Sequence, residues 1–420
     1  MTSTRSLRST YLAAAACAVL AGLGACAGSG SMSSGASLGA GDSGGSSPVN
    51  DVNLAGAPAF RYPANAPVGS PDPRVGLKAG ESAADAGAAA WNMRLLSNTP
   101  ATTGFSGRGA TGSDLAFTGK YAVQGNYRGF QTWDISDPKA PKLVVGFLCP
   151  SSQGDPTIAA NLLFISGEAN GSRNDCGTTN ISDTVSMDRF RGIRVVDISD
   201  MAHPRVVTNI QTCRGSHTNT LVRDPHDNDN VYIYVSGYSS VRSSTEVAGC
   251  MTAPAGDSLS AQFRIEIIKV PLAHPEQAKV VNSPHLLADL SGRTVHAPPP
   301  SDTGPRPPRA GRAGAPPGGA PGAAPAGRAG GAGRGNGVGQ SGCHDITSYP
   351  DLGYAGGACA GYGLVFDIRD ASNPKRLISV ADSNMSFWHS ATFSNDGRKI
   401  LFSDEWGGGS APRCRATDKM

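Results

Sequence analysis

Three histidines occupy the same position in a short repeated pattern of this 420-residue chain. The pattern H-x-x-T-x-x-x-D begins at His217, His344 and His389, and an apolar segment follows each copy. Glu168 and Glu405 hold matching positions at the end of the next apolar segment. Imidazole and carboxylate donors of this kind bind copper, zinc or iron. The sequence therefore predicts a transition-metal site made of His217, His344, His389 and Glu405, provided that the copies of the pattern converge in space.

The same pattern has a structural interpretation that competes with the metal site. Repeats copy structural devices as readily as ligands, so each histidine can simply bond a neighbouring strand while the threonine and aspartate fix a turn. His226 has acidic neighbours and is a minor candidate for calcium, but its loop lacks the D-x-D-x-D-G spacing. His203 and His274 precede prolines in turns and are expected to face solvent.

A second repeat shows which elements must position these residues. The repeat consists of an apolar strand, an aspartate-initiated turn, a proline and another apolar strand. This order is typical of a β-hairpin, because the Asp side chain accepts N–H groups of the turn and Pro, which has no N–H to donate, suits a turn or a strand edge. The copies span 130–141, 193–204 and 364–374, with a degenerate copy at 265–275.

Together the two repeats predict an all-β fold, a β-propeller of four-stranded blades. His344 and His389 are 45 residues apart, about the length of one blade. We expect blades to begin near Asp114, Asp155, His217, His344 and His389. The first strand of each blade lines the axis, so residues at its start meet near one mouth of the channel. An antiparallel sandwich is the alternative, and the 45-residue period disfavours it.

Three segments resemble the LVIVD-repeat family of exported bacterial proteins. They are G-F-Q-T-W-D-I-S-D-P, G-I-R-V-V-D-I-S-D and G-L-V-F-D-I-R-D, beginning at Gly129, Gly192 and Gly363. The resemblance covers about 114 to the end and implies a β-propeller of about seven blades, of which four to five are present here, so the chain is expected to be truncated. The segment His344–Thr347 also faintly resembles a strand start in selenium-binding proteins and methanethiol oxidases, whose channels are lined with histidines.

The N-terminal segment is typical of an exported protein. Residues 1–25 have a short basic start and an apolar run that ends in L-G-A-C, which resembles a lipobox, so residues 1–25 are predicted to be a lipoprotein signal peptide and Cys26 the lipid anchor to a membrane. Ordinary signal-peptidase cleavage is the alternative. Residues 26–105 are expected to be a flexible tether with one short helix around 83–96, followed by the propeller at 106–420.

An insertion rich in Pro, Gly, Ala and Arg interrupts the propeller at 297–342 and is predicted to be disordered. Its five arginines exceed its one acidic residue, Asp302, by four, so the net charge of +3 is concentrated in this segment. No aromatic residues stand between them to stack on bases, so no nucleic-acid partner is expected.

Cysteine usage also fits an exported protein. Three sequence-neighbour pairs are expected to form disulfides, and Cys414 is left without a partner. The pairs are Cys149 with Cys176, Cys213 with Cys250, and Cys343 with Cys359.

Two functions are compatible with these features. The first is a cell-envelope scaffold, anchored by lipid on the periplasmic, outer-membrane or cell-surface side, that binds a protein or carbohydrate partner. The second is a metal-binding propeller, using copper, zinc or iron, that can act as an oxidoreductase. Hydrolase, kinase and dinucleotide motifs are absent from the sequence, which leaves open whether the protein is an enzyme.

Overall fold

The computed structural model describes residues 94–107, 109–290, 341–382, 385 and 387–405. The predicted signal peptide, Cys26, nearly all of the predicted helix at 83–96, almost the whole 297–342 insertion and Cys414 lie outside the described residues. Within the described part, no helix is long and apolar enough to cross a membrane.

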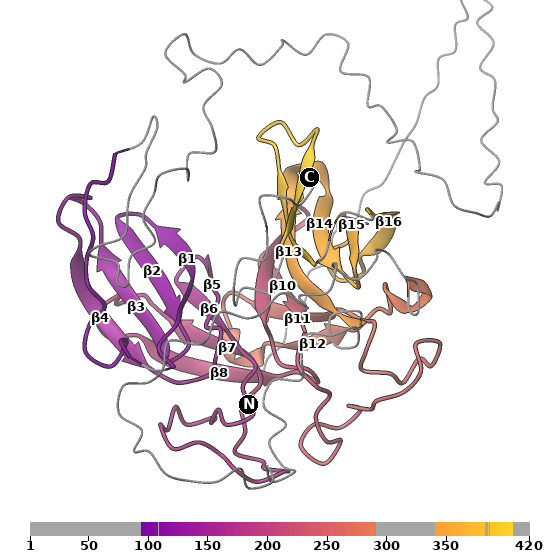
Figure 1. Ribbon diagram of the computed structural model, residues 1–420, viewed down its shortest axis with the longest axis horizontal. Helices are drawn as coiled ribbons and strands as arrows, with labels where there is room; N and C mark the ends of the chain where they lie inside the picture. Colours follow the sequence, from indigo (N-terminus) through magenta and orange to yellow (C-terminus); the bar gives the residue numbers. More distant parts are fainter. Residues whose placement is uncertain (1–93, 108, 291–340, 383–384, 386, 406–420) are drawn as a thin grey trace, which may run out of the picture. The chain divides into compact units, whose positions relative to one another are not determined.

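The described chain folds into four four-stranded antiparallel sheets and one two-stranded sheet (Figure 1). In every sheet the strands pair in the order of the chain. The strands are β1 (Gly112–Thr118), β2 (Tyr121–Asn126), β3 (Gly129–Asp134) and β4 (Lys142–Leu148); β5 (Pro156–Ala159), β6 (Leu162–Gly167), β7 (Gly192–Asp197) and β8 (Arg205–Gln211); β9 (Thr218–Asp224), β10 (Asp227–Ser236), β11 (Glu266–Pro271) and β12 (Lys279–Asn282); β13 (Cys343–Tyr349), β14 (Tyr354–Cys359), β15 (Tyr362–Asp367) and β16 (Lys375–Val380); and β17 (Trp388–Phe393) with β18 (Ile400–Asp404). Short 3-10 turns lie at Pro275–Gln277, Ala288–Leu290 and Pro350–Leu352.

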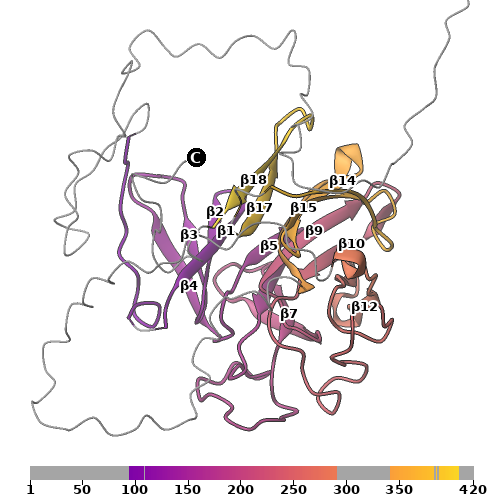
Figure 2. The same cartoon turned by 45° about the vertical axis from the view of Figure 1, so that its right-hand side comes forward.

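Each four-stranded sheet is one blade of a β-propeller, and the two-stranded sheet is part of a fifth blade. The first strands are neighbours in succession, β1 beside β5, β5 beside β9, β9 beside β13 and β13 beside β17. Figure 2 shows the two-stranded sheet lying against the fourth blade, in agreement with the contacts of β17 with β13 and β14. The predicted all-β propeller and its blade starts are confirmed, with four four-stranded blades and two strands of a fifth among the described residues.

Apolar clusters between successive blades hold the sheets together. Phe130 and Leu163 belong to the cluster between the first and second blades. Phe164 and Ile233 pack between the second and third, and Tyr234 and Phe366 between the third and fourth. A fully buried side chain of this size contributes about 1.5–3 kcal/mol.

The aspartate turns predicted from the repeat are present at the third-to-fourth strand junctions. The Asp134 carboxylate accepts the backbone N–H of Ser136 at 2.9 Å, and Asp197 accepts that of Ser199 at 2.9 Å. Asp367 accepts the N–H of Arg369 at 3.0 Å. The three copies of the repeat therefore form equivalent hairpins.

The three predicted disulfides are formed. Cys149 is bonded to Cys176, Cys213 to Cys250, and Cys343 to Cys359. The last pair joins directly opposed residues of β13 and β14, next to His344. Disulfides are typical of proteins outside the cytoplasm.

Glycine is required at the start of β3 and β7, where the backbone enters the third strand with φ of 137° at Gly129 and 149° at Gly192. A Cβ at Gly192 would overlap the carbonyl oxygen of Ile210 on the neighbouring strand, and one at Gly129 would overlap that of Phe147. The first two blades thus have the same backbone conformation at the start of the third strand.

We predict that Gly192→Ala lowers the free energy of unfolding by at least about 2 kcal/mol, because the new methyl group adds strain at positive φ and displaces a paired carbonyl. Gly256→Ala is the matched control, since no atom lies within 4 Å of its added Cβ, and it should change stability by less than about 0.5 kcal/mol. Urea unfolding followed by circular dichroism measures both. Equal stability of the two variants would contradict the role given to Gly192.

Candidate metal centre

The three histidines of the repeated pattern converge. His217 immediately precedes β9, and His344 and His389 are the second residues of β13 and β17. The ring centroids of His217 and His344 are 4.4 Å apart, and those of His344 and His389 are 4.3 Å apart. The neighbouring first strands thus bring imidazoles from three blades together, as the repeat predicted.

The ends of the second strands supply carboxylates to the same place. Glu168 follows β6, and its Oε1 lies 3.0 Å from Nδ1 of His217. Glu405 follows β18, and its Oε2 lies 3.9 Å from Nε2 of His389. The two glutamates occupy equivalent positions in their blades, which the sequence register also indicated.

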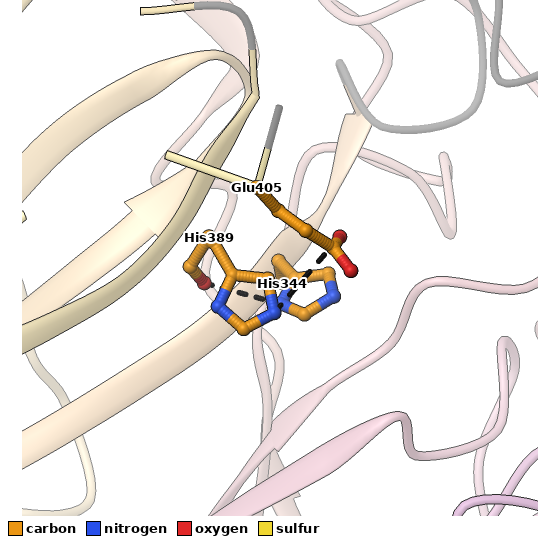
Figure 3. Close-up of side chains that lie close together, drawn as sticks. All are labelled: His344, His389 and Glu405. Carbon is orange, nitrogen blue, oxygen red and sulfur yellow. Dashed lines mark hydrogen bonds and ion pairs between the residues drawn. The ribbon is translucent and has the colours of Figure 1, made fainter. Parts of the chain in front are cut away.

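His344, His389 and Glu405 form a group that could hold a metal ion (Figure 3). Each offers one ligand atom, and these atoms all lie within 4.8 Å of one another. His344 is buried, with 7% of its surface exposed, whereas His389 and Glu405 are partly exposed. His217 was predicted to belong to the same set but lies outside this group of three, although its Nε2 is 2.9 Å from Nε2 of His344.

The tautomer of His344 is fixed by its neighbour. Its Nδ1 lies 3.1 Å from the backbone carbonyl oxygen of His389, which can only accept a hydrogen bond. Nδ1 therefore donates its hydrogen, and Nε2 keeps its lone pair. Metal-bound histidines are held in this way by a carbonyl or carboxylate on the other ring nitrogen.

The threonine and aspartate of the pattern have structural roles. The Thr220 hydroxyl donates to the carbonyl of Ile346 at 2.5 Å and so joins β9 to β13. Asp224 accepts the backbone N–H of His226 at 2.8 Å and fixes the following turn. The structural interpretation of the pattern is thus correct for these two positions, while the histidines face one another.

Several residues near the site had no signal in the sequence. The side-chain amide nitrogen of Gln153 lies 2.7 Å from Nδ1 and 2.6 Å from Nε2 of His217. The rings of Tyr238 and Phe387 pack near His344, with centroids at 5.6 and 5.3 Å. Gln153 is brought in by a loop in which it and Ser152 have positive φ, and such a conformation leaves no motif in the chain.

Asp155 occupies the histidine register of the second blade but serves the packing of the first strands. Its Oδ2 accepts the backbone N–H of Asn219 at 2.6 Å and the Asn219 side chain at 3.1 Å. Burial raises the pKa of Asp155 well above its usual range, and the nearby Asp114 carboxylate raises it further.

The remaining histidine candidates lie away from the group. The His203 and His274 side chains are 82% and 65% exposed, as expected for turn residues. Near His226, the Asp227 carboxylate accepts hydrogen bonds from Asn230 and Tyr232 and is 3.5 Å from the Lys269 ammonium. No group of three histidine, cysteine or acidic ligands forms around His226 within the described ranges, so the structure gives no support to the calcium candidate.

Two imidazoles and one carboxylate are the protein ligands of many catalytic zinc sites and of non-haem iron(II) sites. Such sets leave coordination positions for water or a substrate. A metal ion there can polarise a carbonyl or phosphoryl oxygen, lower the pKa of bound water or, with a redox-active metal, support oxidation.

Comparison with known proteins gives distant structural likenesses. A chain in the crystal structure of a nidogen/laminin complex aligns with 70% of this chain and 72% of its own length, at 10% identity and a TM-score of 0.33. A functionally unknown protein from Desulfotomaculum acetoxidans DSM 771 aligns with 70% of this chain and 63% of its own, at 12% identity and a TM-score of 0.36. At this similarity neither bears on function. No family model and no curated protein matches the chain.

The raised pKa of Asp155 predicts a pH dependence of stability. Because the folded protein holds this proton more tightly than the unfolded chain, the free energy of unfolding should fall as pH rises from the usual carboxyl range to the folded pKa, and then level off. Asp155→Asn cannot ionise and should lack this part of the decline. Urea unfolding at a series of pH values, with a chelator present, measures the difference. Parallel pH profiles for the two proteins would contradict the prediction.

Proposed function

We propose that this protein is an extracytoplasmic β-propeller that binds one transition-metal ion, zinc, copper or iron, through His344, His389 and Glu405. The observation that carries the proposal is the convergence of their ligand atoms within 4.8 Å of one another. These residues come from two adjacent blades and are separated by up to 61 positions in sequence (405 − 344 = 61). A histidine register kept in three blades is the feature that this function explains.

The surroundings of His344 support binding. Its ring lies among Tyr238, Phe387 and two other imidazoles, so this ligand is largely shielded from water. Its strand is joined to β14 by the adjacent Cys343–Cys359 disulfide and to β9 by the Thr218 hydroxyl, which donates to the His344 carbonyl at 2.9 Å. A ligand held in place before binding loses little conformational entropy when the ion arrives.

The anchored scaffold remains part of the proposal. The LVIVD-like repeats and the lipobox around Cys26 support a lipoprotein of the cell envelope, and the three disulfides fit that compartment. In this form the propeller presents its loops to an envelope protein or carbohydrate while the histidine group holds the ion. If the ion is copper or iron, the open positions suit oxidative chemistry.

We predict that the purified full chain, after export and without added chelator, contains about one equivalent of zinc, copper or iron per chain by elemental analysis. His344→Ala, His389→Ala and Glu405→Gln should each weaken binding at least about tenfold, because each removes one of three ligands and 1.4 kcal/mol corresponds to a factor of ten. His203→Ala is the control and should bind like the wild type, since His203 is exposed and remote from the group.

Isothermal titration with zinc and with copper measures these affinities. The metal-binding function would be refuted if the wild-type protein took up neither metal. It would also be refuted if a variant that combines His344→Ala, His389→Ala and Glu405→Gln bound metal as well as the wild type.

Lipid anchoring has its own test. Cys26→Ser should move the protein from the membrane fraction to the soluble extracytoplasmic fraction, because the substituted residue cannot take a lipid chain. Cys17→Ser is the matched control, since Cys17 lies within the predicted signal peptide, and it should stay membrane-bound. Immunoblots of separated fractions give the result. A Cys26→Ser protein that stays with the membrane would contradict lipid anchoring at this residue.

A further inference from the structure

We infer that His217, oriented by Glu168, is a fourth ligand of the ion held by His344, His389 and Glu405. The complete donor set would be three imidazoles and one carboxylate from three blades. This inference rests on the proposed metal-binding function and adds to it a residue that the group of three does not contain. It also assigns Glu168 the role of a positioning residue.

The contacts of Glu168 define the state of the His217 ring. Glu168 Oε1 lies 3.0 Å from Nδ1 of His217, and its Oε2 accepts the Ser239 hydroxyl at 3.2 Å. Nδ1 of His217 has two neighbours, this carboxylate and the Gln153 amide nitrogen, which lies at 2.7 Å and can only donate. Once Gln153 turns away, Nδ1 donates its hydrogen to Glu168 and Nε2 has the lone pair that a ligand needs. A carboxylate on the far side of a metal-bound imidazole is a common arrangement, and it makes the ring a better ligand.

The two inner ring nitrogens lie close together. Nε2 of His217 and Nε2 of His344 are 2.9 Å apart, and Nδ1 of His344 donates to the His389 carbonyl. At this distance the two Nε2 atoms can share a hydrogen, as in a hydrogen bond, or a metal ion that replaces that hydrogen. Neighbouring nitrogen ligands that bind an ion at about 2.0–2.1 Å are about 2.9–3.4 Å apart, depending on the bond angle. The distance between the two rings therefore suits ligands of a shared ion.

Three side chains must adjust for the four donors to meet. Gln153, whose amide nitrogen is 2.6 Å from Nε2 of His217, occupies the lone pair that the ion would take and has to turn away. His389 and Glu405 must move closer to His217, and their side chains are 35% and 23% exposed, which leaves room for a change of rotamer. His217 and His344, the two buried imidazoles, are already at ligand spacing.

The number of imidazoles bound to the ion shows whether His217 is a ligand or lies outside the coordination shell. The full chain is loaded with one equivalent of Cu²⁺, and pulsed electron paramagnetic resonance counts the imidazoles from their remote ring nitrogens. We expect three imidazoles in the wild type and two in His217→Ala. A wild type with only two, or a His217→Ala protein that keeps three, would overturn the inference.

Further variants distinguish a failure of the inference about His217 from a failure of the metal-binding function. Glu168→Gln should keep three imidazoles but bind copper about 10–100-fold more weakly, because it loses the partner that orients the His217 ring. His203→Ala is the control and should match the wild type in both measurements. If His217→Ala does not fold, as judged by circular dichroism, the imidazole count of the wild type decides alone. Absence of copper binding to the wild type would instead refute the proposed function itself.

Discussion

The candidate site depends on the register between neighbouring first strands. Hydroxyl groups of β9 donate to carbonyls of β13, from Thr218 to His344 at 2.9 Å and from Thr220 to Ile346 at 2.5 Å, and Ser348 donates back to Leu221 at 2.7 Å. These bonds replace the backbone ladder that exists within each sheet but not between blades. A slip of one residue would turn His344 to the opposite face of its strand and separate it from His217.

The long segments between the second and third strands of two blades supply residues that contact the histidines. Glu168 and Tyr238 each lie at the start of an excursion, and the buried Arg214 donates to the Tyr238 and Ser239 carbonyls at 3.1 and 2.8 Å. Burial lowers the pKa of Arg214 to about 10. The excursions are tied together by Glu246, which is paired with Arg189 and Arg242 in the interior. Removing one partner of such a buried network costs about 3–5 kcal/mol, so the loops that carry the site are fixed firmly.

Sequence repeats made the fold and the histidine convergence predictable, because equivalent residues in successive blades must occupy equivalent places. The aspartate turns at Asp134 and Asp197 and the alignment of His344 with His389 follow from this rule alone. What a repeat cannot predict is a departure from it. Gln153 reaches His217 from a loop that lies outside both repeated patterns, and whether His217 joins the other ligands depends on rotamers that a pattern of residue types does not encode.

A metal ion in this position would also act on the fold. Within the described residues the fifth sheet consists of β17 and β18, and its contacts with the fourth blade are made chiefly by β17 against β13 and β14. His344 belongs to the fourth blade, and His389 and Glu405 belong to the two-stranded sheet, so the ion would cross-link the two. Because the unfolded chain does not bring these ligands together, the free energy of metal binding would add to that of folding. The same three residues would therefore connect metal binding with the stability of the two-stranded sheet.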